Sequence, residues 1–550
     1  MRSSRLSTGI SMTDGRPEKS FQGIGVSGGI AMGPLYVMRE AAIARRVFTA
    51  AAEETRLFQA AIAQAKAQLA ALIAGQDELA GEILEFQLAL LEDDDLLSPV
   101  MRTIESGIAC DAAWKSVLDV EIAEYRKGGD DVLAARAADL TDLRDRVLLL
   151  LNGAIAEGAE LPEGAILVAA DLTPSGFLAL DWTRIGGAAT LRGSPTSHVS
   201  ILARARGLNL VIGLAAELQG LAAGAPAILD AVEGRLIVDP RGETTSAARA
   251  RIAAAKDHSR AAEALLTRPA ATASGEPVKI LINIDEPERL DALSPEICDG
   301  VGLMRTEFLF PGCHQPGEDE QLAFYRRLSE WAQGRPVTIR TLDAGGDKPI
   351  PGVTIDGEAN PFLGVRGLRL SLARPEIFRI QLRALARAAA SGPVNVMFPM
   401  VTVPAELTEA RRMMSEEIAA LEQRGIACAR PPMGMMIEVP AAALTAESFD
   451  ADFYSIGSND LIQYTLACSR DNTSLARLAD AARPAILELI RRTAEAARKR
   501  GVSVSICGDM ASTPALVGPL LDTGLRVLSC APAQVGAVKL AVSQYRPQSR

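Results

Sequence analysis

One histidine stands in a stretch that suits a chemically active imidazole. The chain holds only three histidines, and His198 lies in the run GSPTSHVSILARAR that starts at Gly193. Pro195 suits a turn, Ser197 is a common helix N-cap residue, and the apolar positions that follow predict a short amphipathic helix ending at Gly207. The ring would then lie in the first helical turn, where unpaired N–H groups and the helix dipole favour a phosphate. A lone histidine at a helix start is more often a capping or surface residue, so catalysis needs support from elsewhere in the chain.

A second set of polar residues follows strand-like runs in the C-terminal half. Eight such runs alternate with helical patterns, as in a (β/α)₈ barrel. The runs cover residues 278–284, 300–303, 337–339, 394–398, 434–437, 453–456, 502–506 and 527–529. The polar or reactive residues directly after them are Asp285, Arg305, Arg340, Glu438, Asn459, Asp460 and Cys507. Because the carboxyl ends of barrel strands share one face, we expect these side chains to line one mouth.

The residue types at this mouth suit a small, highly charged acid as substrate. Glu438 and Asp460 are hard oxygen ligands of the kind that Mg²⁺ takes in ones and twos, together with waters and substrate oxygens. Arg305 and Arg340 offer bidentate guanidinium groups to a phosphate or carboxylate. Three further candidate cations are Lys348, Arg366 and Arg470. Each residue alone is as easily a loop or salt-bridge residue, but the set favours an active site.

Cys507 has two interpretations. No histidine lies near it in the sequence, so it is either a buried inert thiol or, at a strand end in a cationic site, a group that gives or takes a proton.

Composition bounds the class of protein. At 550 residues the chain is too long for one core and predicts about three or four domains. The net charge of −11 argues against a general nucleic-acid or anionic-membrane surface. Seven scattered cysteines without a CxxC pair are typical of a reducing compartment. No run reaches the length of a membrane span and the polar start has no apolar signal-peptide segment, so we expect a cytoplasmic protein.

The pattern along the chain predicts an interrupted N-terminal half. Strand-like runs at residues 24–38 resume at residues 165–168 and continue to residues 235–238, with helical periodicity between them. The fold class is therefore multidomain α/β. The predicted parts are a tail (1–20), an α/β histidine domain (21–41 and 153–240), an inserted helical bundle (42–152), a linker helix (241–274) and the barrel (275–545). The bundle is either simply packed helices or a docking surface.

In its motifs and their order, the chain resembles enzyme I of the phosphoenolpyruvate-dependent sugar phosphotransferase system over about residues 21–545. Several long motifs in the right order carry the resemblance. They are IGVSGGIAMG from Ile24, LLEDDDLL from Leu90, TSHVSILAR from Thr196, GVGLMRTEFLF from Gly300, RTLDAGGDK from Arg340, NPFLGVRGLR from Asn360, MFPMV from Met397, GMMIEVPAA from Gly434, SIGSNDLIQYTLA from Ser455 and CGDM from Cys507.

The resemblance implies phosphoryl transfer from phosphoenolpyruvate (PEP) to His198 and then to the small phosphocarrier protein HPr, docked on the helical insertion. Pyruvate would leave, in the first step of sugar uptake. The family motifs imply that Arg305, Arg340, Asn459 and Arg470 hold PEP, that Glu438 and Asp460 hold Mg²⁺, and that Cys507 protonates the enolate. They also imply a homodimer through the barrel and a swivelling phosphohistidine domain. Lys348, Arg366 and Asp460 complete the predicted substrate site.

Two other interpretations stay open at this point. One is a relative of phosphoenolpyruvate synthase or pyruvate phosphate dikinase, which would need a nucleotide-binding domain and a Gly-rich phosphate loop. The other is a phosphorylation-dependent regulator whose barrel no longer turns over. The chain also departs from the family, because Gly193-Ser194-Pro195 stands where Gly-Gly-Arg is common.

Overall fold

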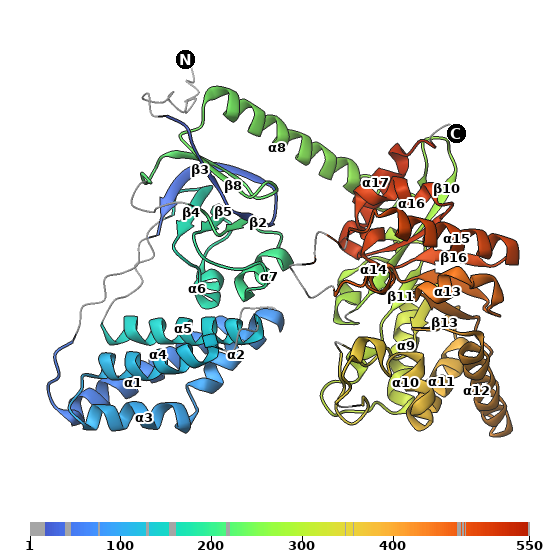
Figure 1. Cartoon of the computed structure of the whole chain (residues 1–550), viewed down its shortest axis with the longest axis horizontal. Coiled ribbons are helices and arrows are strands. Elements are labelled where there is room, and N and C mark those ends of the chain that lie inside the picture. The colour runs from blue at the N-terminus through green and yellow to red at the C-terminus, as the bar shows by residue number, and fades with distance from the viewer. Residues whose placement is uncertain are drawn as a thin grey trace, which may run out of the picture. The chain divides into compact units, whose positions relative to one another are not determined.

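A computed structural model gives the fold of the chain (Figure 1). The residues that it describes are 17–38, 46–74, 78–127, 131–152, 161–215, 221–285, 287–346, 348–355, 357–469, 475, 478 and 480–547. The chain divides into two compact units, Met1–Ala255 and Lys256–Arg550. Each unit is described by itself below.

The first unit is built on an eight-stranded sheet. Its strands are β1 (Lys19–Gln22), β2 (Ile24–Ser27), β3 (Ile30–Val37), β4 (Ala165–Ala169), β5 (Ile185–Thr190), β6 (Leu210–Ile212), β7 (Pro226–Asp230) and β8 (Arg235–Val238). They lie in the order β1-β8-β7-β3-β4-β5-β6-β2. The four strands from β3 to β6 are parallel, and the outer pairings are antiparallel. β4 is buried along its whole length, as expected for an apolar parallel strand covered on both faces.

Helices cover one face of this sheet in two layers (Figure 1). The insertion between β3 and β4 forms α1 (Ala51–Ile73), α2 (Glu78–Leu90), α3 (Asp94–Glu105), α4 (Cys110–Lys127) and α5 (Asp131–Leu151). Two short helices, α6 (Pro174–Ala179) and α7 (His198–Ala205), lie between the bundle and the sheet. One continuous core joins Phe58 and Trp114 of the bundle to Phe177 of α6, Leu202 of α7 and Leu167 of β4. The insertion and the α/β part are thus packed together through apolar side chains.

The linker helix α8 (Gly242–Glu263) is anchored at both ends. Near its start, Ala248 packs on Ile228 and Ile237 of the first unit. Beyond its end, the buried Lys539 of the second unit donates hydrogen bonds to the carbonyl oxygens of Leu266 and Arg268. Residues 252–261 between these contacts are mostly exposed.

Two short strands lie where the sequence predicted none. Lys19 and Ser20 fall in the predicted tail but belong to β1, because their backbone pairs with Val238 and Ile237 of β8. The linker helix predicted over residues 241–274 ends at Glu263. Ala270 and Ala271 instead form β9 (Ala270–Ala271), which pairs with the start of the first barrel strand.

The second unit is a closed parallel barrel. Its strands are β10 (Pro277–Ile284), β11 (Val301–Met304), β12 (Val337–Arg340), β13 (Val394–Phe398), β14 (Met433–Ile437), β15 (Phe453–Ile456), β16 (Ser503–Ile506) and β17 (Val527–Cys530). Each pairs in parallel with the next, and β10 pairs with both β11 and β17, which closes the ring. The (β/α)₈ barrel expected from the eight runs is confirmed.

Helices surround the barrel (Figure 1). They are α9 (Glu318–Trp331), α10 (Leu368–Ala373), α11 (Pro375–Ala389), α12 (Pro404–Gln423), α13 (Pro440–Leu444), α14 (Ser458–Leu466), α15 (Pro484–Arg500), α16 (Pro514–Asp522) and α17 (Val535–Gln544). Alternate strand residues such as Val396, Ile437 and Ile456 fill the core between strands and helices. The other alternate residues point into the barrel, where Leu303, Met397, Met436 and Cys507 form a separate small cluster.

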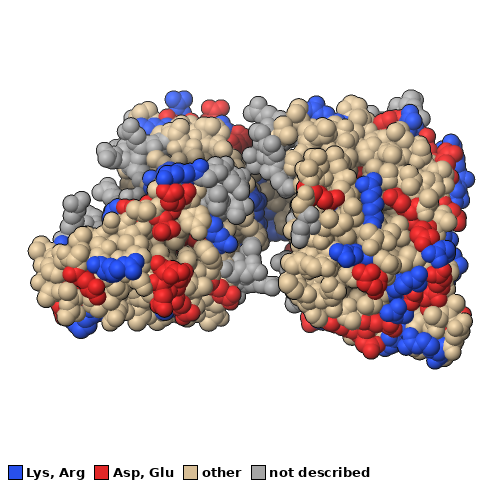
Figure 2. Space-filling model, turned by 60° about the horizontal axis from the view of Figure 1, so that its bottom comes forward, with Lys and Arg blue, Asp and Glu red and all other residues tan. Residues whose placement is uncertain are grey.

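The surface of the described residues is mixed in charge. On the face seen in Figure 2, acidic and basic side chains are interspersed over both units. Within the described ranges, no helix combines the length and the hydrophobicity that crossing a bilayer requires.

Candidate active site

His198 is the first residue of α7, as the sequence predicts. Ser197 is the N-cap, and its hydroxyl accepts a hydrogen bond from the N–H of Ser200 at 3.3 Å. Gly207, with a φ of 62°, follows the end of the helix. Val199, Leu202 and other apolar positions bury one face of α7, so the helix start is held in place by packing. The histidine side chain is 23% exposed, which leaves part of the ring accessible.

A buried carboxylate of the helical insertion holds this ring. Nδ1 of His198 lies 3.0 Å from Oδ1 of Asp139, whose side chain is 1% exposed. The other oxygen of Asp139 is buried without a hydrogen-bond partner, and the guanidinium of Arg136 lies 3.9 Å from it. Arg136 itself stacks 3.8 Å above the centre of the Phe86 ring. No local sequence pattern points to Asp139.

A second carboxylate one turn along α5 binds the α/β part as well. Asp142 accepts hydrogen bonds from the N–H and the hydroxyl of Ser175, at 2.9 and 2.6 Å, in the first turn of α6. Gln87 of α2 donates to the same carboxylate at 3.0 Å. Asp139 and Asp142 therefore tie one face of α5 to the two short helices.

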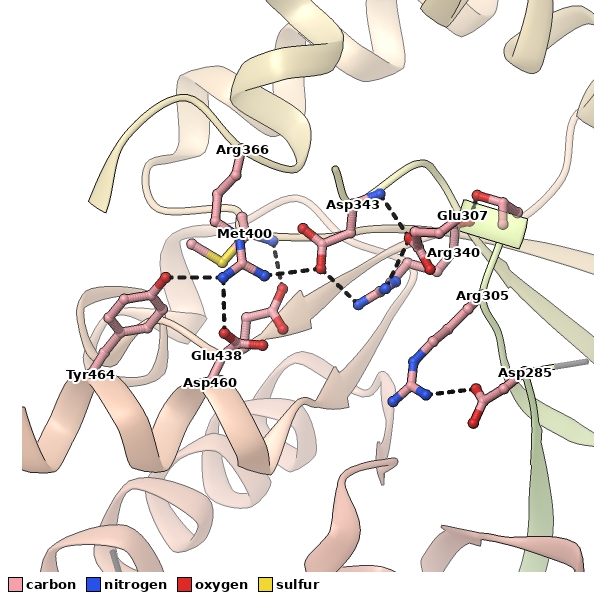
Figure 3. A network of polar contacts seen from close by, with 11 residues as sticks. Asp285, Arg305, Glu307, Arg340, Asp343, Arg366, Met400, Glu438, Asp460 and Tyr464 are labelled. Carbon is pink, nitrogen blue, oxygen red and sulfur yellow. Dashed lines mark hydrogen bonds and ion pairs between the residues drawn. The ribbon is translucent and has the colours of Figure 1, made fainter. Parts of the chain in front are cut away.

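The centre of the barrel mouth is a carboxylate shared by two arginines (Figure 3). Oδ2 of Asp343 lies 3.0 Å from Arg340 and 3.1 Å from Arg366. All three side chains are at most 5% exposed. Burial opposes ionisation of Asp343, but the two guanidinium groups lower its pKa. Neighbouring carboxylates likewise outweigh burial for Arg340 and Arg366 and raise the pKa of both.

Glu307 and Asp460 complete the contacts of these arginines. Glu307, in a short 3₁₀ turn after β11, accepts from Arg340 and from the backbone N–H of Asp343, both at 2.9 Å. Arg366 donates to Asp460 at 3.1 Å and to the hydroxyl of Tyr464 at 3.3 Å. The sequence predicted Arg340, Arg366 and Asp460 at one mouth. In the structure Arg366 pairs with Asp460 directly and is joined to Arg340 through Asp343.

Glu438 lies in the same cluster but has no arginine partner among the described residues. Its Oε1 accepts the backbone N–H of Met400 at 2.6 Å, and Met400 has a φ of 55°, a conformation that costs a non-glycine residue energy. Burial above all, and then the carboxylates of Asp460 and Asp343, raise the pKa of Glu438 to about 8. A strained backbone turn thus positions a carboxylate amid other carboxylates.

Two glycines make room for this network. Gly345 has a φ of 106°, and a Cβ there would lie 2.7 Å from Cβ of Arg366. A Cβ on Gly457, the residue before α14, would lie 2.8 Å from Oε2 of Glu438. Larger residues at either position would displace a functional side chain.

Arg305 and Lys348 lie at the edge of the cluster. Arg305 pairs with Asp285 at 2.6 Å, and both side chains are more exposed than those at the centre. Burial, followed by the charge of Arg340, lowers the pKa of Lys348.

Cys507 lies just beyond β16, on the inside of the barrel and 2% exposed. Its thiol donates to the carbonyl oxygen of Ile456, with sulfur and oxygen 3.6 Å apart. Burial raises the pKa of Cys507 to about 11 despite a hydrogen bond from Ser455. The group is therefore a protonated thiol at neutral pH, which can give a proton but is a poor nucleophile.

The other two predicted PEP ligands are Asn459 and Arg470. Oδ1 of Asn459 accepts the backbone N–H of Asp509 at 3.0 Å, so this amide braces the turn after Cys507. Arg470 lies outside the described residues.

Comparisons with known proteins agree with this geometry. Residues 22–136 match the N-terminal domain of PEP-utilising enzymes, residues 161–234 their mobile domain, and residues 259–546 their PEP-binding domain. A phosphoenolpyruvate-protein phosphotransferase of Geobacillus stearothermophilus is 36% identical over 95% of this chain and 94% of its own length. The chain belongs to the enzyme I family of phosphoenolpyruvate-protein phosphotransferases.

Other members of the enzyme I family give the same picture. The phosphoenolpyruvate-protein phosphotransferase of Bacillus sp. (strain S) is 35% identical over 96% of this chain and 93% of its own length. A multiphosphoryl transfer protein of Xanthomonas campestris pv. campestris is 38% identical over 96% of this chain, which spans only 64% of that relative. The resemblance carried by the sequence motifs is confirmed.

Whether this enzyme I can hold a metal ion depends on the donor atoms that its side chains offer. Among the described residues, no group of three or more His, Cys, Asp or Glu side chains is placed to hold a metal ion. Glu438 and Asp460 nevertheless fit Mg²⁺, because this ion needs only one or two protein carboxylates. Burial above all, and then the neighbouring carboxylates of Asp460 and Asp343, raise the pKa of Glu438, and a cation bound beside it would favour its ionised form.

Four functional residues lay beyond the sequence analysis: Asp139, Glu307, Asp343 and Met400. Asp343 follows Arg340 by three residues in RTLDAGGDK, and Glu307 follows Arg305 by two in GLMRTEFLF. The signal for Asp343 and Glu307 in the sequence was therefore a charged residue that shares a motif with a predicted site arginine. For Asp139, on a helix far from His198 in the sequence, no local signal exists.

Proposed function

We propose that the protein takes the phosphoryl group of PEP onto His198 and passes it to a histidine of HPr, releasing pyruvate. The observation that carries this proposal is the buried cluster in which Asp343 joins Arg340 and Arg366 beside the carboxylates of Glu438 and Asp460. It lies in the part of the chain that matches a PEP-binding domain. Fixed cations beside a possible metal site suit a substrate that carries a phosphate and a carboxylate.

His198 acts as the nucleophile through Nε2. An ionised carboxylate only accepts hydrogen bonds, so Asp139 selects the tautomer in which Nδ1 carries the hydrogen. The lone pair is then on Nε2. Asp139 is a positioning residue in this account, because it orients the ring and stabilises the positive charge that develops when the N–P bond forms.

The barrel binds PEP and stabilises the charge that moves during transfer. Arg340 and Arg366 are held by Asp343 before substrate arrives, and we assign them, with Arg305, Lys348, Asn459 and Arg470, to the oxygens of PEP. Glu438 and Asp460 would hold Mg²⁺. When bound, Mg²⁺ supplies positive charge to the substrate oxygens. Preorganised charges of this kind need no rearrangement at the moment of reaction.

Cys507 supplies the proton that completes the reaction. The P–O bond of PEP breaks as the P–N bond to His198 forms, which leaves the enolate of pyruvate. The S–H hydrogen of Cys507 then moves to C3 of the enolate and gives pyruvate. A pKa of about 11 keeps the thiol protonated until an enolate, a much stronger base than water, lies beside it.

The remaining assignments rest on the family. HPr docks on the helical insertion of residues 42–152, and residues 21–41 with 153–240 form the domain that carries the phosphohistidine. The protein is a cytoplasmic homodimer joined through the barrel of residues 275–545. Asp139 supports the docking assignment, because this residue of the insertion touches the ring that must meet the carrier.

Pyruvate formation with and without HPr tests the proposal. Protein, Mg²⁺ and PEP alone should release about one pyruvate per chain, and adding HPr in excess should convert this burst into continuous release. A regulator with an inactive barrel would give no pyruvate in either case. Continuous release without HPr would show that water, and not a protein histidine, receives the phosphoryl group.

A further inference from the structure

The inner face of β16 carries a row of small polar residues that leads to Cys507. Val504 and Ile506 pack into the core outside the barrel. The alternate residues Ser503, Ser505 and Cys507 therefore point into the barrel. The proposed function uses only the last of these residues.

Hydroxyl groups from two strands connect along this face. Ser455 of β15 lies opposite Ser505 of β16 in the strand register, and the hydroxyl of Ser505 donates to that of Ser455 at 3.2 Å. Tyr454 and Ile456 pack outside the barrel, so Ser455 faces its interior beside Cys507, close enough for its hydroxyl to lower the pKa of the thiol. The thiol itself donates to the carbonyl oxygen of Ile456. Ser455 therefore neighbours both the hydroxyl of Ser505 and the thiol of Cys507.

Exposure along the row increases away from the mouth. Cys507 is 2% exposed and Ser455 is completely buried. Ser505, one layer further toward the amino end of the barrel, is half-buried, and Ser503 at the start of β16 is exposed. The row thus becomes more exposed toward its far end, while the thiol itself is shielded.

We propose that Ser455 and Ser505 form a relay that returns a proton to Cys507 from the amino end of the barrel after each turnover. The relay rests on the proposed function, in which Cys507 gives its proton to the enolate. The thiolate left behind is buried, and pyruvate lies between it and the mouth. The serines give it a second route to solvent that does not wait for the product to leave.

The proton count of the relay is balanced. The thiolate sulfur takes the hydrogen of the Ser455 hydroxyl, Ser455 takes the hydrogen of Ser505, and Ser505 takes one from water. The hydroxide left in solvent is neutralised by buffer. Each serine ends as it began, and the net change is one proton moved from solvent to sulfur.

Hydrogen exchange at the thiol tests this relay in the full-length protein. Protein equilibrated in H₂O is mixed with excess D₂O and, after a variable delay, with Mg²⁺ and a limiting amount of PEP. The methyl group of the pyruvate, read by mass spectrometry, then reports whether the thiol held hydrogen or deuterium. We expect Ser455→Ala and Ser505→Ala to lengthen the exchange time about tenfold or more, with first-turnover labelling of His198 nearly unchanged.

Two further variants separate a relay from a structural role. Ser505→Thr keeps a hydroxyl and should exchange as fast as the wild type. Thr338→Val alters a residue of the same barrel on β12, 7% exposed, whose hydroxyl accepts a hydrogen bond from Asn395 at 3.4 Å, and should also behave as the wild type. Wild-type exchange in both alanine variants would overturn the relay.

The outcome for the relay is distinct from that for the proposed function. If Cys507→Ala forms pyruvate at the wild-type rate, the thiol is not the proton donor and the relay is overturned with that step. If Cys507→Ala is slow but both serine variants exchange normally, the donor assignment stands and only the relay fails.

Discussion

The histidine site and the barrel mouth are built on opposite principles. Among the described residues, His198 makes one charged contact, with Asp139, and part of its ring is exposed. The barrel mouth is a buried network of ion pairs in which one oxygen can contact two partners, as Oδ2 of Asp343 contacts Arg340 and Arg366. The first site leaves part of its ring accessible to a partner. The second has its charges placed in advance and has little freedom to rearrange.

This difference matches the two tasks of phosphoryl transfer. A nucleophile that serves a small-molecule donor and a protein acceptor must be accessible and lightly held. Charge stabilisation needs fixed dipoles and ions in a place that excludes water. Predictions can therefore be aimed at one region at a time.

The largest effect is expected from His198→Ala. Incorporation of phosphate from PEP should be abolished, because the variant lacks the imidazole that accepts the phosphoryl group. Binding of PEP to the barrel, measured by calorimetry with Mg²⁺, should be unchanged. Weakened PEP binding would contradict the separation of the two sites.

Cys507→Ala should slow pyruvate formation by about 10²- to 10⁴-fold, because the enolate loses its proton donor. Cys530→Ala is the matched control. Cys530 is completely buried and burial raises its pKa to about 12, but it lies in the core outside the barrel. Stopped-flow detection of pyruvate should therefore show a normal rate for the control, and equal rates in the two variants would remove the thiol from the mechanism.

Asp343→Asn should destabilise the barrel by about 3 to 5 kcal/mol, since two buried guanidinium groups lose a shared anion. Asp285→Asn removes a carboxylate from Arg305 at the exposed edge, where about 1 kcal/mol or less is expected. Calorimetric unfolding of both variants measures the difference. Similar losses of stability in the two variants would mean that the ion pairs at the centre of the mouth contribute no more than the pair at its edge.

Asp139→Asn should slow phosphorylation of His198 by about 10- to 100-fold, the effect typical of losing a carboxylate that orients a histidine. Asp142→Asn, one turn along α5, should lower stability by about 1 to 3 kcal/mol through its lost contacts with α6, at a nearly normal rate. Rapid-quench labelling separates the two. A rate loss confined to Asp142→Asn would reverse the assignment.

The smallest effect concerns thiol reactivity. Iodoacetamide at pH 8 should modify the exposed Cys313 first and Cys507 last, because burial raises the pKa of Cys507 to about 11 and the thiolate is scarce below that pH. The rate at Cys507 should increase as the pH approaches 11. Peptide mapping by mass spectrometry follows each site, and fast, pH-independent modification of Cys507 would contradict a buried, protonated thiol.

Much of the barrel was predictable because apolar strands between turn residues are local signals. The runs at residues 394–398 and 453–456 coincide with β13 and β15. Arg340, Glu438 and Cys507 could be named as mouth residues because each ends or follows a strand, and chain topology alone brings strand ends together.

The missing residues depend on tertiary contacts. Asp343 and Glu307 matter through the arginines they hold, and Met400 through the backbone N–H that its strained turn aims at Glu438. Asp139 is one of several acidic residues on α5, and only packing of the bundle against α7 distinguishes it. The short β9 was missed because two alanines in a strand resemble a linker.

The most direct test of the account is to locate the phosphate. Protein incubated with Mg²⁺ and PEP is digested at alkaline pH, and acid-labile phosphate is mapped by mass spectrometry while pyruvate is counted. We predict one phosphate per chain on His198, matched by one pyruvate. Phosphate on another residue, or pyruvate without any phosphoprotein, would contradict the central claim.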